Sequence, residues 1–362
     1  MGFIFTSKSV LTEKQRKMYA AEKAQNFRWI SKLLATYSTY TLSDKDLTPV
    51  ELGVELSKIG QFAELCYSTI PIELLLQLFT ELNQIDFPLE GYDAFKDVIL
   101  ISSFKGTFGK LPAYVAYRAT RKQLVVVVSG TSSVEHALHD LRFFKRRHPS
   151  GKGAVHSGFW DLYSGIKLDA LAGIKKGLEE HEVDELVITG HSMGGSIATL
   201  LVMDILELGD LPPGLNLIIA TFGAPRAGDA GLVEHWRMLI ASVRQANGFN
   251  FLKEYAVKGY NDGVPALPPA KIGYRHFAEE PLYTVNGLLY RVPSSECEHS
   301  LFRVLPAEGN DEHTSEYPYG GHNYYSGRQL ERFIRRIAWL DSAKFAEPGW
   351  EDRYKILANK HA

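Results

Sequence analysis

The stretch of residues 184–203, DELVITGHSMGGSIATLLVM, decides the fold. A β-branched run that ends at Gly190 is followed by an Ala-, Leu- and Met-rich run, which predicts a strand and then a helix. Between them the pattern G-x-S-x-G places Ser192 on a tight turn, where glycines at 190 and 194 avoid side chains that would collide with the crossing chain. The first N–H groups of the following helix would point at an anion forming at Ser192, which predicts a nucleophile. A glycine-rich turn with an idle serine is the alternative.

The rest of the chain alternates between strand patterns and helix patterns. Apolar runs typical of buried strands occupy residues 97–104, 113–119, 122–130, 215–223, 250–257 and 282–292. Helical patterns occupy residues 12–40, 51–69, 72–82, 159–180, 193–208, 231–245 and 326–340. Polar turns at 120–122 and at Asn286-Gly287 predict hairpins. Strands that are apolar on both faces and alternate with helices predict an α/β fold, with a mostly parallel central sheet covered by helices on both faces.

The sequence predicts one catalytic domain with additions at both ends. We expect the catalytic domain at residues 91–345 and a C-terminal tail at 346–362. Residues 1–90 are expected to form extra N-terminal helices, with an apolar face at 51–82. Because no Gly/Ser/Pro linker separates this segment from the rest, it should pack on the catalytic sheet.

Composition argues against several classes of function. The formal net charge is -2, and no basic stripe is interleaved with aromatic residues, so we expect no nucleic-acid partner. No His/Cys cluster has the spacing of zinc ligands, so we expect no metal and no cofactor.

The compartment is predicted from cysteine usage and from the first residues. Cys66 and Cys297 are too few for a disulfide framework, and the start MGFIFTSKSVLTEKQRK has no continuous apolar leader, which favours a cytoplasmic protein. Gly2 and Thr6 match the minimal pattern for N-myristoylation, which would make the protein membrane-peripheral. We favour the alternative of an ordinary N-terminus.

A nucleophilic serine needs a base and an acid that orients the base, and in this architecture they follow in the order Ser, Asp/Glu, His. Asp262 follows an apolar strand and precedes the proline-stiffened turn of NDGVPALPP, which makes it the candidate acid. Asp229 is the rival, although its position at a helix start is typical of an N-cap. His322, in the loop GGHNYY before the last helix, is the favoured base. The other histidines after Asp262 are His276, His299, His313 and His361.

Eight motifs, in order, resemble the class 3 lipase family of α/β-hydrolases, which includes the small fungal triacylglycerol lipases. They are VVVVSGTSS at 125–133, HDL at 139–141, VHSGFWDLY at 155–163, VITGHSMGG at 187–195, TFGAPRAGD at 221–229, NDGVPALPP at 261–269, GYRHF at 273–277 and GGHNYY at 320–325. The resemblance implies an α/β-hydrolase fold over roughly residues 95–340.

Carried over residue by residue, the resemblance makes Ser192 the nucleophile, Asp262 the acid and His322 the base. It also implies an oxyanion hole, to which Thr131 would give a backbone N–H and its hydroxyl, and Met193 a second N–H. Four further positions match family positions with an expected structural role: Asp140, His156, Pro225 and Arg226.

The chain departs from the family pattern at two positions near these residues. Gly321 stands where family members often have an acid before the catalytic histidine. Ser129 stands where many have an aromatic residue or an arginine. Secreted members also have disulfides that two cysteines cannot reproduce.

These residues predict a serine carboxylester hydrolase for lipid esters, a mono-, di- or triacylglycerol lipase that works through an acyl-enzyme. Residues 132–150 occupy the place of the family's lid and combine an apolar side with the cations KRR, so we expect transient contact with a membrane or lipid-droplet surface. An ordinary covered helix with solvated charges is the alternative there. The alternative functions are a phospholipase A1, an esterase for aromatic acids, and a non-catalytic lipase-like scaffold.

Overall fold

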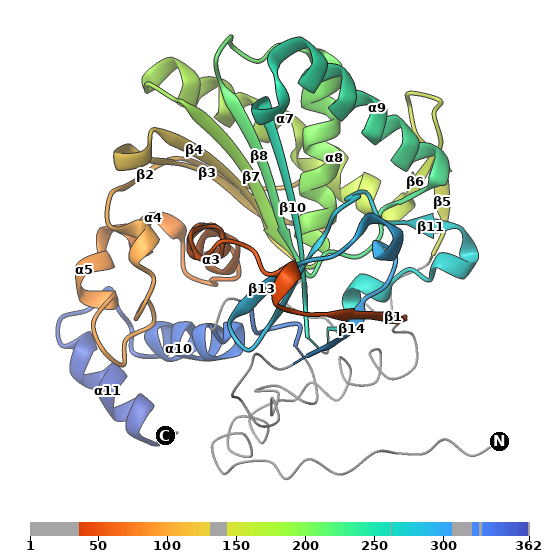
Figure 1. Ribbon diagram of the computed structural model, residues 1–362. Coiled ribbons are helices and arrows are strands. Elements are labelled where there is room, and N and C mark those ends of the chain that lie inside the picture. The colour runs from red at the N-terminus through yellow and green to blue at the C-terminus, as the bar shows by residue number, and fades with distance from the viewer. Residues whose placement is uncertain (1–35, 131–142, 261, 306–320, 326–327, 361–362) are drawn as a thin grey trace.

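The computed structural model describes residues 36–130, 143–260, 262–305, 321–325 and 328–360. A mixed eight-stranded sheet forms its centre (Figure 1). Its strands, in spatial order, are β13 (Leu288–Arg291), β12 (Leu282–Val285), β10 (Leu252–Gly259), β8 (Asn216–Phe222), β7 (Glu185–His191), β4 (Gln123–Val128), β3 (Pro112–Arg118) and β2 (Val98–Lys105). The run from β4 through β7, β8 and β10 to β12 is parallel, while β2, β3 and β13 are antiparallel to their neighbours. The predicted α/β fold with a mostly parallel sheet is confirmed.

Helices cover both faces of this sheet, as Figure 1 shows. One face carries α7 (Ser157–Glu180), α8 (Met193–Leu208) and α9 (Ala230–Asn247). The other carries α3 (Val50–Leu65), α4 (Ile72–Gln77), α5 (Phe79–Leu82), α10 (Leu330–Ser342) and α11 (Trp350–Lys360). In β4, Val126 and Val128 pack into the first layer and Val125 and Val127 into the second. Each buried valine stabilises the fold by roughly 1.5–3 kcal/mol, which explains the uninterrupted apolar run.

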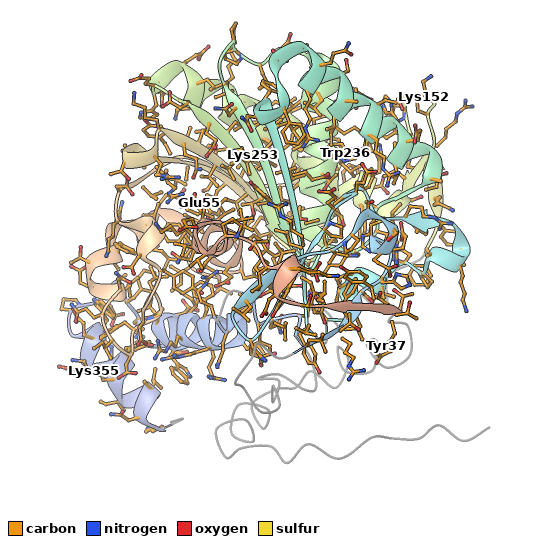
Figure 2. All side chains as sticks on the ribbon, viewed as in Figure 1. Tyr37, Glu55, Lys152, Trp236, Lys253 and Lys355 are labelled. Atoms are coloured by element: carbon orange, nitrogen blue, oxygen red, sulfur yellow. The ribbon has the colours of Figure 1, made fainter. Side chains whose placement is uncertain are left out.

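Single side chains tie the layers to the sheet. Trp236 of α9 is fully buried and donates its indole N–H to Glu254 on β10 at 2.9 Å (Figure 2). On the other face, Glu55 of α3 lies 3.2 Å from the guanidinium of Arg118, at the end of β3. Residues 50–65 therefore pack directly on the catalytic sheet. The division into domains at residues 90 and 345 stays a prediction.

Two smaller sheets lie beside the central one. Four short antiparallel strands form the first, in the order β11 (Tyr274–Arg275), β9 (Gly228–Asp229), β6 (Ala154–His156) and β5 (Lys145–Arg147). The second pairs β1 (Tyr37–Leu42) in parallel with β14 (Leu301–Val304). The helix expected to run to residue 40 is therefore wrong at its end, because Tyr37–Leu42 gains backbone hydrogen bonds from a partner that local sequence does not reveal.

The predicted turns have the backbone that their sequences require. Asn286 and Gly287 have φ values of 50° and 76°, as a tight hairpin turn between β12 and β13 demands. Within the expected C-terminal tail, residues 350–360 form helix α11, whose Trp350 and Tyr354 pack against Phe87. Short 3-10 turns lie at Asp44–Asp46, Asp93–Phe95, Ala119–Arg121, Phe249–Phe251, Val264–Ala266, Ala270–Ile272 and Ser294–Glu296. None of the helices in the described ranges is long and apolar enough to cross a bilayer.

Candidate active site

Ser192 lies on the turn between β7 and α8 and has a strained backbone. Its φ of 59° and ψ of -135° fall outside the regions that L-residues ordinarily occupy. A Cβ at Gly190 would lie 2.4 Å from the carbonyl carbon of Gly194, and one at Gly194 would lie 2.2 Å from the carbonyl oxygen of Val128. Both glycines are therefore required for the chain to cross here, as the sequence pattern indicates. The strain holds Ser192 on the tight turn at the N-terminus of α8.

The two predicted oxyanion donors stand differently. Met193 is the first residue of α8, so its N–H is among those that a helix start leaves without an intrahelical acceptor. Thr131 lies outside the described residues. The residue two positions before it, Ser129, is buried, with its hydroxyl 2.8 Å from the carbonyl of Gly130 and 3.3 Å from that of Cys66. In this chain a small side chain thus occupies the position where relatives often carry an aromatic residue or an arginine.

Asp262 and His322 form a buried hydrogen-bonded pair. The Asp262 carboxylate is fully buried, and its Oδ2 lies 2.9 Å from Nδ1 of His322. Tyr325 donates its hydroxyl to the same oxygen at 2.6 Å, and the backbone N–H of Val264 donates to Oδ1 at 2.8 Å. Three donors thus converge on one carboxylate, which stabilises its charged form and sets the plane of the His322 ring.

The acid–base pair lies beside the turn that carries Ser192. The backbone N–H of Ser192 donates to the carbonyl of Phe222, at the end of β8, at 2.8 Å. The next residue, Gly223, has a φ of +60°, and a Cβ there would lie 2.6 Å from Asp262 Oδ2 and 3.0 Å from His322 Nδ1. The ring of His191, which precedes Ser192, lies with its centroid 4.4 Å from that of His322. The structure therefore brings the predicted nucleophile, acid and base to one end of the parallel strands.

Arg226 anchors the loop that carries the acid. Its fully buried guanidinium donates to the carbonyls of Ala266 at 2.6 Å and Pro268 at 3.1 Å. It also pairs with the Glu298 carboxylate at 2.8 Å. Burial lowers the pKa of Arg226, and Glu298 opposes that shift. The side chain thus cross-links the acid loop, which agrees with the structural role expected for this position.

The rival candidates have other roles. Asp229 caps α9, accepting the backbone N–H of Leu232 at 3.0 Å, as its sequence setting indicates. His276 is buried, and burial lowers its pKa well below the usual value. His299 lies 3.0 Å from Glu296. His313 and His361 lie outside the described residues, as does Asp140. His156 caps α7 by accepting the N–H of Phe159 at 3.2 Å.

Two tyrosines at the site have no role in the sequence interpretation. Tyr325 stands in the quoted motif GGHNYY, and its contact with Asp262 follows from its place three residues after His322. Burial raises its pKa well above the usual value, and the charge of Asp262 acts in the same direction. Tyr67, at the C-terminal end of α3, reaches His191, and no motif identified it.

Gly321 explains one departure from the family pattern. A Cβ at this position would lie 1.8 Å from the carbonyl oxygen of Tyr260, so no side chain fits before His322 without moving the backbone. We expect Gly321→Ala to destabilise the fold by about 1–3 kcal/mol and to lower the rate constant of any reaction that uses His322. Thermal unfolding and ester hydrolysis measure the two effects.

The matched control for Gly321→Ala is Gly53→Ala in α3. A Cβ at Gly53 meets nothing within 4 Å, so the same substitution should stabilise the helix by about 0.5–1 kcal/mol. A Gly321→Ala protein with unchanged stability and activity would contradict the tight approach of the two loops.

The described side chains supply acid–base chemistry around a serine. Among the residues that the structure describes, no group of His, Cys, Asp and Glu side chains could hold a metal ion. The pair of Asp262 and His322 can instead accept and return one proton, and the start of α8 can stabilise an anion at Ser192. Such an arrangement suits acyl transfer through a covalent intermediate.

Comparison with known proteins agrees with this chemistry. Residues 125–272 match the family model described as Lipase (class 3). The chain is 29% identical to a lipase of Rhizomucor miehei over 216 residues, which are 58% of this chain and 56% of that lipase. It is 30% identical over 190 residues to secreted mono- and diacylglycerol lipase 1 of Fusarium solani, 52% of each chain. The chain thus spans about half the length of the curated relatives it matches.

Solved structures show the fold independently. The structure superposes on a triacylglycerol lipase described as having a serine protease triad at its catalytic centre, with a TM-score of 0.60 and 21% identity. The superposition covers 79% of this chain and 98% of that one. The fold is therefore the α/β-hydrolase fold.

The prediction of a cytoplasmic location is wrong. The relative from Fusarium solani is named a secreted lipase, which contradicts it. The prediction relied on the scarcity of cysteine, and both Cys66 and Cys297 are indeed free. A core of this size buries enough apolar surface to fold without disulfides, so cysteine count says little about the compartment. Gly2 lies outside the described residues.

Proposed function

Residues 125–272 belong to the class 3 lipase family, and on this premise we propose that the protein hydrolyses carboxylic esters of lipids, with mono-, di- or triacylglycerols as substrates. The observation that carries the proposal is the buried pair of Asp262 and His322 beside the strained turn of Ser192. Such a pair has no need to lie at a nucleophile elbow unless a proton moves there. The whole chemical constellation of acid, base and serine is what acyl transfer requires.

The proposed reaction has two steps. His322 takes the proton of Ser192 as the serine oxygen attacks the ester carbonyl, while Asp262 holds the ring and stabilises the imidazolium. The backbone N–H groups of Met193 and Thr131 stabilise the oxyanion, each by about 3 kcal/mol. His322 then protonates the departing alcohol, and an acyl-enzyme on Ser192 remains. Water, activated by His322, releases the carboxylic acid in the second step.

A groove beside the oxyanion loop offers room for a lipid substrate. It has a volume of about 710 Å³ and extends from Gly130 along Ile70 and Pro71 to Phe104 of β2. Its walls come partly from the segment that precedes the family-matched residues. We therefore propose that residues 36–90 belong to the same functional unit as the catalytic residues.

Contact with a lipid surface is a further part of the proposal. Of the expected lid, residues 143–150 are described, and Lys145–Arg147 form strand β5 with exposed side chains. Phe144 beside them is 68% exposed. An exposed aromatic ring next to cations favours an anionic lipid surface.

Labelling with a fluorophosphonate tests the proposed nucleophile. We expect stoichiometric labelling of the protein, with the adduct found on Ser192 by peptide mass spectrometry. A panel of esters that varies in chain length and head group then separates glyceride lipase from phospholipase A1 and from an esterase for aromatic acids. A folded protein that neither labels nor hydrolyses any ester in the panel would contradict the proposal and favour a non-catalytic scaffold.

A further inference from the structure

The hydroxyl of Tyr67 joins parts of the site that are far apart in the sequence. Tyr67 is 7% exposed and lies just after α3, outside the family-matched residues. Its hydroxyl lies 2.8 Å from Nδ1 of His191, the residue before Ser192. The other ring nitrogen of His191, Nε2, lies 2.7 Å from the backbone carbonyl of His322. One tyrosine thus reaches the backbone of the candidate base through a single imidazole.

These contacts determine which nitrogen of His191 carries the proton. A carbonyl oxygen can only accept, so Nε2 must donate to the carbonyl of His322. Nδ1 is then the acceptor in a neutral ring, and Tyr67 donates to it. The carbonyl of His191 is a poorer acceptor for the same hydroxyl, at 3.5 Å. Burial lowers the pKa of His191 well below its usual value, which agrees with a neutral ring.

The same hydroxyl lies against the oxyanion loop. A Cβ at Gly130 would lie 2.0 Å from the Tyr67 oxygen, so the phenol occupies the space that a side chain at 130 would need. Burial raises the pKa of Tyr67, and a backbone hydrogen bond from Gly130 opposes that shift. Tyr67 therefore contacts the residue that precedes Thr131 as well as the elbow.

A second contact holds α3 against the segment that follows the base. The guanidinium of Arg328 makes two contacts with the Glu64 carboxylate of α3, at 2.8 and 2.9 Å. The backbone N–H of Arg328 donates to the carbonyl of Tyr325 at 3.2 Å. Because a bidentate pair restricts both distance and orientation, it keeps Tyr67 and the His322 loop in register.

We propose that Tyr67 is a positioning residue for the base: by donating to Nδ1 of His191 it holds that ring in the tautomer whose Nε2–H fixes the backbone of His322, and so aims the His322 imidazole. The inference rests on the proposed function, in which His322 is the base. It adds a role for a segment that the family model does not match. Tyr67 touches neither the substrate nor the reacting atoms.

The test compares Tyr67→Phe with the wild type on a short soluble ester. We expect kcat to fall roughly 10- to 100-fold while KM changes less than about twofold, because misaiming a base slows chemistry without removing substrate contacts. His191→Gln keeps an amide N–H for the His322 carbonyl and should retain most of the activity. His191→Leu removes the donor and should lose as much as Tyr67→Phe, with no further loss in the double variant.

Tyr117→Phe is the matched control. Tyr117 is also 7% exposed, stacks on a histidine, His181, and donates to a backbone carbonyl at 2.8 Å, but it lies on β3 away from the site. It should lower the melting temperature as Tyr67→Phe does and leave kcat unchanged. Equal kcat losses in both variants, or none in a folded Tyr67→Phe protein, would overturn the inference.

A spectroscopic measurement decides the inference without relying on catalysis. In protein with ¹⁵N-labelled histidine, the His191 signals should show the neutral Nε2–H tautomer between pH 6 and 8, about the usual range in which histidine titrates. The Nδ1–H signal of His322 should shift in Tyr67→Phe and stay in place in Tyr117→Phe. A proton on Nδ1 of His191, or an unmoved His322 signal, would refute the positioning role even if the wild type proved inactive, a result that would separately refute the proposed function.

Discussion

Ser192→Ala is expected to lower kcat for ester hydrolysis by about 10⁵- to 10⁶-fold, to the level that binding and the oxyanion donors alone can sustain. The serine oxygen is the atom that forms the acyl-enzyme, and alanine offers no nucleophile. The backbone strain at φ 59° is the same for alanine as for serine, so the free energy of unfolding should change by less than about 1 kcal/mol. Initial rates on a soluble ester and thermal unfolding measure both quantities.

The control for Ser192→Ala is a second buried serine on the same helix. Ser196 is 2% exposed and donates its hydroxyl to the carbonyl of Pro225 at 2.7 Å. Ser196→Ala should cost about 1 kcal/mol of stability and leave ester hydrolysis close to wild type. Wild-type activity in a folded Ser192→Ala protein would end the assignment of this serine as nucleophile.

The features that sequence predicted well are those whose physical cause is local. Glycines at 190 and 194 are required by backbone atoms four residues away or on the adjacent strand, and the motif shows them directly. The run of valines in β4 reports burial on both faces of the sheet. Asn286-Gly287 specifies its own turn through positive φ values. In each case the deciding contact lies within one element or its nearest neighbour.

The features that sequence missed depend on partners far along the chain. Strand β1 exists because β14 hydrogen-bonds to it, and Thr36 is 264 residues from Ser300. Tyr67 lies in a helical segment with nothing to distinguish its hydroxyl, and only folding brings it to His191, 124 residues away. For the acid and base, residue type and chain order narrowed the choice to a few. The contact of Asp262 with His322 distinguishes them from Asp229 and the other histidines.

Asp262→Asn is expected to lower kcat by about 10⁴-fold while the protein stays folded. The native carboxylate accepts from three donors, namely His322 Nδ1–H, the Tyr325 hydroxyl and the N–H of Val264. An asparagine keeps one acceptor oxygen and introduces an N–H₂ group, so one of the three donors must meet another donor. The His322 ring can relieve that clash by moving its proton to Nε2, and a base with its proton on Nε2 cannot take the proton of Ser192.

The matched control is Asp229→Asn, which removes the same charge at the rival position. Asp229 accepts the N–H groups of Ala154 and Leu232 on a single oxygen, Oδ1, both at 3.0 Å, and asparagine caps helices as well as aspartate does. Activity should therefore stay near wild type. Tyr325→Phe removes only one donor to Asp262 and should give an intermediate loss of about tenfold. If Asp262→Asn and Asp229→Asn lost activity equally, the effect would be one of net charge, and Asp262 would have no special part in orienting His322.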